Sequence, residues 1–173
     1  MTMLSSLLFF IFLGLGLFYL KELMLDPQVY IRPLAPLLFY VSLKDSLALA
    51  FILAVVLGLL QDSYALAPFG VHLLSSLILV GVARLARRTF LMKNALSLIL
   101  AMLVALILQE LGVRLILTIL GSRDIFLADL SLARGLELLV TALLTPVFFA
   151  LIRTLERHLG RLGRPRRRQA ATW

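Results

Sequence analysis

Residues 32–45 have the sequence RPLAPLLFYVSLKD, and the topology of the whole chain depends on whether this stretch crosses a membrane. Its apolar run, Leu34–Leu43, is ten residues long and stops at Lys44. A helix of that length rises only about 15 Å, whereas a membrane-spanning helix needs roughly 20 predominantly apolar residues. Pro33 and Pro36 suit the start of a helix better than its interior. We therefore expect a helix here that is short, tilted or interrupted.

Five longer apolar segments lie on either side of this stretch, and none shows the alternation of apolar and polar residues that is typical of a strand. They are Met3–Leu20, Ser46–Leu60, Phe69–Ala83, Ala95–Leu120 and Leu132–Ile152. Hydrophobic residues make up 62% of the 173 positions and charged residues 15%, whereas a soluble domain averages about 45–50% and 25%. A chain of this length cannot bury so much apolar surface by itself. The composition therefore predicts an all-α, polytopic membrane protein with about six transmembrane helices over residues 1–155, followed by a basic tail over residues 156–173.

The distribution of lysine and arginine predicts the orientation, because cytoplasmic loops carry an excess of both. With a cytoplasmic N-terminus and six crossings, twelve basic residues lie on the cytoplasmic side, namely Lys44, the cluster Arg84–Lys93 and the tail. Three lie in outer loops, namely Lys21, Arg32 and Arg123. Without a crossing at Leu34–Leu43, the cluster and the tail would lie on opposite faces. The first twenty residues have no basic start and no small-residue cleavage motif, so we interpret them as a retained helix. We expect a bacterial inner-membrane protein whose two termini are cytoplasmic.

Four charged residues fall within the outer halves of the last two predicted helices. Glu110 and Arg114 are four residues apart and share a helix face, and Arg134 and Glu137 lie at a similar depth on the next helix. This spacing allows Glu110 to pair with Arg134 and Arg114 with Glu137. Ionisable groups inside a membrane are functional candidates, because isolated charges are costly there. The cluster is either a structural clasp between the two helices or a contact for a partner or substrate.

A second group of candidates surrounds the turn between the third and fourth apolar segments: Asp62, Pro68, Gly70 and His72. We expect Asp62 to cap the turn by binding backbone amides, as aspartate commonly does, rather than to act in catalysis. His72 has two interpretations. It is either a ligand or pH-sensing group, or a side chain that caps a helix start or bonds a neighbouring carbonyl.

The basic tail begins with Arg153, Arg157 and Arg161, which recur every four residues and so line one face of a helix that leaves the membrane. It continues with Arg164, Arg166, Arg167 and Arg168. Anionic lipid headgroups of the inner leaflet attract such segments. We therefore expect the tail to contact anionic lipids rather than nucleic acid, with a cytoplasmic protein as the alternative.

No catalytic, metal or cofactor site is expected. The sequence Gln109-Glu110-Leu-Gly-Val-Arg114 is one residue away from the Glu-Glu-x-x-x-Arg motif of intramembrane prenyl-protein-type proteases, but that chemistry also needs histidines within the bundle. The chain has two histidines and no cysteine, and His158 lies in the tail. No Gly-x-Ser-x-Gly, HExxH or phosphate-binding glycine loop is present. These observations indicate that the chain is not an enzyme.

The turn also carries a family resemblance. Residues 58–72, GLLQDSYALAPFGVH, resemble the signature of MreD, the rod shape-determining membrane protein family, in which a helix ending Gly-Leu-Leu-x-Asp precedes a loop with Pro-x-Gly and often a histidine. The length, Arg32-Pro33 before a short helix, the Arg84–Arg88 loop and Thr145-Pro146 in the last helix are also similar to the family. One position departs: many members have an acidic residue directly after the proline that opens helix two, where this chain has Leu34.

The resemblance implies a non-catalytic scaffold that maintains rod shape in the complex that builds side-wall peptidoglycan during cell elongation. Its implied direct partner is an MreC-type single-pass membrane protein. Through that partner it would reach the MreB filament, the glycosyltransferase RodA and a penicillin-binding transpeptidase. The family's fold is similar to the six-helix substrate-binding component of energy-coupling-factor transporters, so vitamin capture for uptake is the alternative function. We predict that the partner docks at the outer polar groups or at the Asp62–His72 turn.

Overall fold

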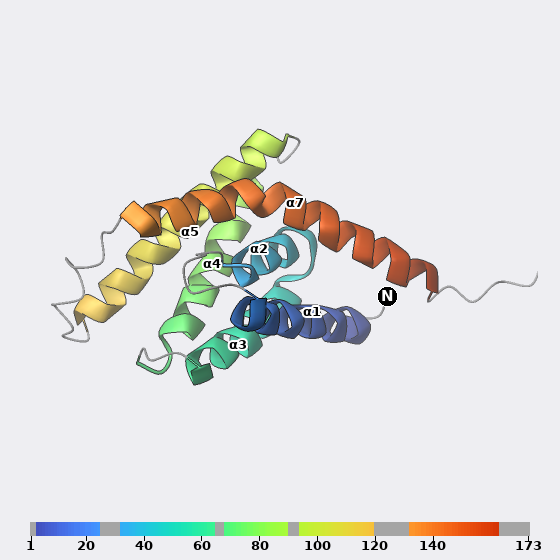
Figure 1. The fold of residues 1–173 in the computed structure, drawn as a ribbon, viewed down its shortest axis with the longest axis horizontal. Helices are drawn as coiled ribbons and strands as arrows, with labels where there is room; N and C mark the ends of the chain where they lie inside the picture. The colour runs from blue at the N-terminus through green and yellow to red at the C-terminus, as the bar shows by residue number, and fades with distance from the viewer. Residues whose placement is uncertain (1–2, 25–31, 65–67, 90–93, 120–131, 163–173) are drawn as a thin grey trace, which may run out of the picture.

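The computed structural model describes residues 3–24, 32–64, 68–89, 94–119 and 132–162, which form six α-helices and, within these ranges, no strand. The helices are α1 (Met3–Met24), α2 (Leu34–Lys44), α3 (Leu47–Tyr64), α4 (Val71–Thr89), α5 (Ala95–Ile119) and α7 (Leu132–Leu162), and Figure 1 shows their arrangement. Each corresponds to one of the six apolar segments, so the predicted all-α fold is confirmed. The predicted domain boundary at residue 155 stays a prediction, since α7 is continuous across it.

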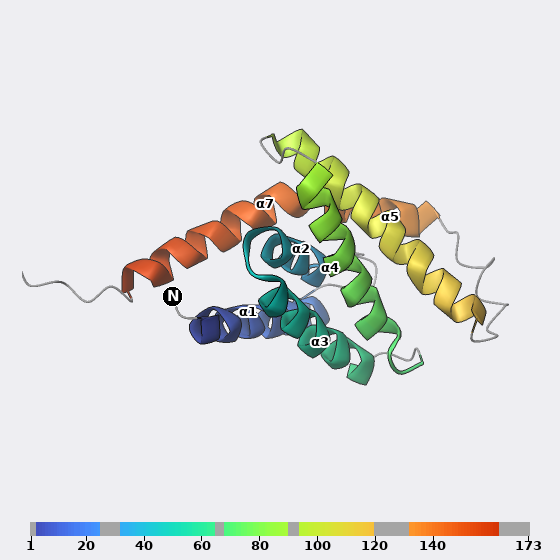
Figure 2. The same ribbon diagram turned by 180° about the vertical axis from the view of Figure 1, so that it is seen from behind.

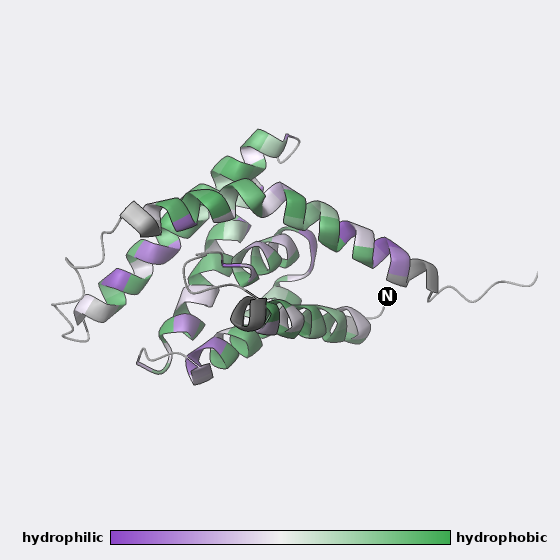
Figure 3. Ribbon diagram, in the orientation of Figure 1, coloured by the Kyte–Doolittle hydropathy of each residue, from purple (hydrophilic) through white to green (hydrophobic). Residues whose placement is uncertain are grey.

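Three helices in the described ranges are long and apolar enough to cross a membrane. They comprise all of α3, Ala95–Ile116 of α5 and Gly135–His158 of α7, and α1 and α2 add shorter apolar stretches. Only 28% of the α5 and α7 stretches is buried inside the protein. Large apolar side chains are exposed along both helices, and the middle of the α7 ribbon is coloured as hydrophobic in Figure 3. A helix that is apolar on both its inner and outer faces fits a lipid environment, so the chain is a membrane protein.

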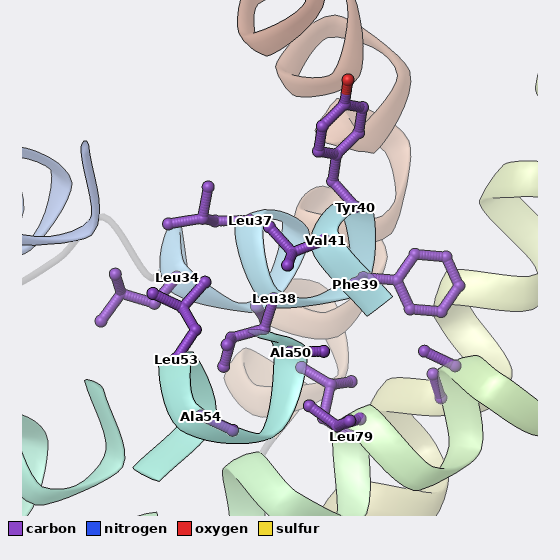
Figure 4. Packing of buried hydrophobic residues seen from close by; sticks show 14 of the residues in the cluster. Leu34, Leu37, Leu38, Phe39, Tyr40, Val41, Ala50, Leu53, Ala54 and Leu79 are labelled. Atoms are coloured by element: carbon purple, nitrogen blue, oxygen red, sulfur yellow. The ribbon is translucent and has the colours of Figure 1, made fainter. Parts of the chain in front are cut away.

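Helix α2 is the centre of the bundle. It contacts all five other described helices, and the views from both sides place it between α1, α4 and α7 (Figures 1 and 2). Every residue from Leu34 to Ser42 is buried. Figure 4 shows Leu37, Leu38 and Phe39 packed towards neighbouring helices, with Leu53 of α3 and Leu79 of α4 beside them. A helix that is apolar on all sides belongs in a core. Helix α2 is accordingly surrounded by other helices of the protein and not by lipid.

Helices α3 and α4 approach closely because α3 has Gly58 at the contact. A Cβ atom there would lie 2.7 Å from the Cα of Leu73 and 2.6 Å from the Oγ of Ser76, both on α4. The Ser76 hydroxyl donates to the backbone oxygen of Ala54 on α3 at 2.9 Å. Small residues that bring backbones together are the usual means of packing helices in membranes. The glycine therefore sets the spacing of this pair.

Helix α7 is bent in its middle (Figure 1), and Pro146 lies inside it. Proline has no N–H to donate to the residue four positions earlier, and its ring clashes with that carbonyl, so it kinks a helix. The preceding Thr145 is fully buried, and its hydroxyl donates to the backbone oxygen of Thr141 at 2.9 Å. The two halves of α7 contact opposite ends of α2: Glu137 pairs with Arg32 before its start, and Glu156 pairs with Lys44 at its end.

Candidate functional site

The described polar side chains of the bundle gather in two layers, one at each end of α2. We define the Arg32 layer as Arg32, Asp62, His72, Gln109, Glu110, Arg114 and Glu137, and the Lys44 layer as Tyr40, Lys44, Asp45, Arg84, Arg87, Arg153 and Glu156. Along α7 the two layers are nineteen residues apart, from Glu137 to Glu156, which is about 28 Å of helix. The same two layers are joined by α2 with eleven residues, about 16 Å of helix, so at the centre of the bundle they are closer together than the roughly 30 Å thickness of a bilayer's hydrocarbon core.

Arg32 is the central group of its layer. Its Nε donates to Oε1 of Glu137 at 2.8 Å, and its Nη1 donates to Oε2 of Glu110 at 3.2 Å. One guanidinium at the start of α2 therefore joins α5 to α7. The side chains are largely buried, with 29% of Arg32 and 12% of each glutamate exposed. Arg114 lies 3.7 Å from the other oxygen of Glu110, so these two residues, four apart on one face of α5, form an ion pair.

Arg32 is predicted from the sequence only as an outer-loop residue, and its role in joining two helices is seen only in the structure. Arg32 is separated by 78 positions from Glu110 and by 105 from Glu137, so local spacing carries no sign of the contact. The one available signal was its place directly before a proline that opens a short apolar helix. The predicted pairs Glu110–Arg134 and Arg114–Glu137 stay predictions, and the Arg134 side chain lies outside the described residues.

The Arg32 layer is close to neutral where it is most buried. Two arginines, Arg32 and Arg114, face two glutamates, Glu110 and Glu137. Charges removed from water must be paired, because an isolated one costs several kcal/mol. The charges of these four side chains are therefore balanced within the cluster.

Asp62 binds the start of α4 from the end of α3. Its Oδ2 accepts the backbone N–H groups of Gly70 at 3.0 Å and Leu73 at 3.2 Å, and its Oδ1 accepts that of His72 at 2.9 Å. Gly70 has a φ of 100°, which a side chain would disfavour. A carboxylate at a helix N-terminus satisfies amides that have no partner within the helix and complements the helix dipole. The end of α3 is thereby tied to the start of α4.

A cavity of about 340 Å³ opens among the members of the Arg32 layer. Its lining includes Arg32, His72, Ser75, Gln109 and Glu137, so α4, α5 and α7 all contribute to it. The Nε2 of Gln109 donates to the Ser75 hydroxyl at 2.5 Å, whereas its buried Oε1 has no hydrogen-bond partner among the described residues. A buried acceptor without a partner is costly. Gln109 therefore brings to the cavity wall an acceptor that the described residues leave unsatisfied.

The Lys44 layer holds the other end of α2 against α7. Glu156 of α7 accepts the Tyr40 hydroxyl at 2.8 Å and forms an ion pair with Lys44. Arg84 of α4 donates to the backbone oxygen of Asp45 at 2.6 Å. The Asp45 carboxyl follows α2, and its burial raises its pKa above the ordinary value. Both ends of the core helix are thus tied by polar bonds to helices that surround it.

The predicted tail is described only in part. Arg153 and Arg157 lie on α7 with exposed side chains, and the helix continues to Leu162. The side chain of Arg161 and the residues Arg164, Arg166, Arg167 and Arg168 lie outside the described residues. Among the residues that the structure does describe, no three histidine, aspartate or glutamate side chains come together as metal ligands.

Comparison with known proteins gives one match. A family model described as "rod shape-determining protein MreD" matches residues 1–155. Neither a search of curated proteins nor a search of solved structures gives a match. The match covers helices α1 to α5 in full and α7 as far as residue 155, and it includes the Asp62–His72 turn.

Proposed function

Because the chain belongs to the MreD family of rod shape-determining proteins, we propose that it is a non-catalytic scaffold of the cell-elongation complex that holds an MreC-type single-pass partner. Through this partner it would connect to the MreB filament, RodA and a penicillin-binding transpeptidase. The family is one of shape-determining membrane proteins, and the predicted membership is confirmed over nearly the whole chain. The family match gives the vitamin-capture alternative no support.

We infer six crossings of the bacterial inner membrane, with the Arg32 layer outermost and the Lys44 layer and both termini at the cytoplasmic face. Consecutive helices alternate in direction, which supports the inference. The starts of α2, α4 and α7, the end of α3 and the second half of α5 meet in the Arg32 layer, and α5 continues beyond it to Ile119. Phe18 near the end of α1 lies with its ring 5.2 Å from that of Tyr64 at the end of α3. The Lys44 layer holds the exposed Arg87 and Arg153, and the exposed Arg157 follows one turn further along α7, as expected for a cytoplasmic face.

The proposed docking surface is the Arg32 layer with its cavity. The observation that carries this proposal is the buried Gln109 oxygen, an acceptor without a described partner beside a neutral cluster of paired charges. Lipid tails are as apolar as leucine, so contacts between membrane proteins depend on packing and on a few polar bonds. A donor on the partner's transmembrane or outer juxtamembrane segment would satisfy the Gln109 oxygen and bury the cavity. The surface lies on α4, α5 and α7, which the core helix holds in place.

Co-purification with the MreC-type partner tests this proposal. Gln109→Leu removes the acceptor at nearly constant volume and should reduce partner recovery at least tenfold, while insertion and thermal stability in detergent stay close to those of the natural chain. Glu110→Lys should abolish recovery. Glu156→Lys reverses a charge in the opposite layer and is the matched control, for which we expect normal recovery. Normal recovery with both Gln109→Leu and Glu110→Lys would overturn the docking surface.

A further inference from the structure

A second cavity, of about 550 Å³, opens in the Lys44 layer. Its lining comes from the end of α2, the end of α4, the start of α5 and the middle of α7. Its volume falls in the range of small-molecule sites, roughly 300–1,000 Å³. Three basic side chains from three helices line it, namely Lys44 of α2, Arg87 of α4 and Arg153 of α7. No described residue of the lining is acidic.

The positive charge of this cavity is only partly neutralised. Lys44 is paired with Glu156, which lies outside the lining. Neither Arg87 nor Arg153 has an ion pair with any residue that the structure describes. Two guanidinium groups that line one cavity without carboxylates repel each other, and an anion between them would remove that cost. The planar arginine fork also binds phosphate oxygens two at a time.

The first turn of α5 adds to this potential. Asn94 and Ala95 line the cavity, and the first bond of the helix runs from the N–H of Leu98 to the oxygen of Asn94 at 3.2 Å. The N-terminus of a helix carries a partial positive charge and favours phosphate. Here it faces the same space as the three basic side chains, so four elements supply positive potential to one cavity.

The remaining lining indicates a lipid as the source of the phosphate. Leu98 of α5 and Pro146 and Phe149 of α7 make the cavity apolar next to its basic groups. On the same two helices, Leu96 is 69% exposed and Val147 56% exposed, which continues the apolar surface outwards. A free phosphate ion would gain nothing from these side chains, whereas an acyl chain would cover them. Basic pockets between transmembrane helices at the cytoplasmic side are a known form of headgroup site.

We propose that this cavity binds the phosphate of an anionic phospholipid from the cytoplasmic leaflet, with Arg87 and Arg153 as the principal ligands and Lys44 and the start of α5 as further positive groups. The choice of leaflet depends on the orientation proposed above. The site is distinct from the docking surface, which lies in the opposite layer. It also differs from contact of the tail with the membrane surface, because it depends on particular side chains and not on total charge.

Native mass spectrometry of the full-length protein, titrated with phosphatidylglycerol or phosphatidylcholine, tests the proposal. We expect phosphatidylglycerol to be retained selectively, and the double variant Arg87→Gln/Arg153→Gln to weaken its binding about 30-fold if each cation contributes as basic residues near a lipid surface do. Arg157→Gln removes the same charge one turn further along α7, outside the cavity, and is the matched control. It should bind as the natural chain does.

Three results would overturn the inference. The first is equal retention of the two lipids. The second is equal weakening by Arg153→Gln and Arg157→Gln, which would show that total charge is what matters. The third is binding of inorganic phosphate as tight as that of phosphatidylglycerol, which would make this a site for a soluble anion. Partner recovery by the double variant separates this test from the docking proposal, because we expect it to be normal whatever the lipid result.

Discussion

Replacement of Arg32 by glutamine tests the role of the Arg32 layer in holding the bundle together. The change removes the charge shared by Glu110 and Glu137, whose distances to Arg32 are 3.2 and 2.8 Å. Glu110 keeps Arg114 at 3.7 Å, so Glu137 becomes the carboxylate without its ion pair to α2. Removal of one partner from a buried ion pair costs about 3–5 kcal/mol. Since 29% of the arginine side chain is exposed, we take the lower end, about 3 kcal/mol.

That loss is measurable as a change in thermal unfolding in detergent. For a chain of 150–250 residues, each kcal/mol shifts Tm by about 2–4 °C, so Arg32→Gln should lower Tm by about 6–12 °C. The double variant Arg32→Gln/Glu137→Gln removes both charges and should recover about 2 kcal/mol of the loss, because no buried carboxylate is then left unpaired.

The matched control is Lys44→Gln at the other end of α2. Its ion pair with Glu156 involves a lysine whose side chain is 49% exposed, and exposed pairs contribute about 0–1 kcal/mol. Equal loss of stability for Arg32→Gln and Lys44→Gln would refute this reasoning. So would a double variant that is less stable than Arg32→Gln alone.

Three further outcomes follow from the same contacts. Gly58→Ala should destabilise the protein by about 1–3 kcal/mol, because its Cβ would lie 2.7 Å from the Leu73 backbone. Gly16→Ala, with nothing within 4 Å, should leave Tm unchanged. Asp62→Ala should cost about 1–2 kcal/mol in chemical unfolding, since three amides at the start of α4 lose their acceptor. Asp45→Asn should raise stability increasingly as pH rises from about 4 to 7: burial raises the carboxyl's pKa, so the stability of the natural chain is fully present below the ordinary pKa and is lost above the raised one.

The helices themselves could be predicted from the sequence, because runs of apolar residues interrupted by charges and prolines carry that information locally. The six segments begin within two residues of α1 to α5 and α7, whereas α4 ends six residues and α7 ten residues beyond the predicted apolar segment. The spacing of Glu110 and Arg114 likewise predicts their shared face. The Asp62 turn was recognisable because its residues are close along the chain.

The place of α2 in the core could not be predicted in this way. Lipid tails and protein interiors are equally apolar, so a run such as Leu34–Leu43 looks the same in either environment. The role of Arg32 also depends on partners that are 78 and 105 positions away. Nor does the sequence reveal that Arg87 and Arg153 line one cavity. Such contacts depend on how the helices pack, which no local pattern records.

Side-specific labelling of single cysteines tests the central claim, which is that α2 crosses the membrane and gathers the basic groups on the cytoplasmic side. The natural chain has no cysteine, so each introduced thiol reports alone. Ser46, Phe69 and Arg157 have exposed side chains and follow α2, precede α4 and lie on α7. We expect Ser46→Cys and Arg157→Cys to react only from the cytoplasm and Phe69→Cys only from outside. The exposed Leu4 at the start of α1 gives the comparison across α2. We expect Leu4→Cys to react from the cytoplasm, as Ser46→Cys does, and labelling of these two thiols from opposite sides would contradict the account.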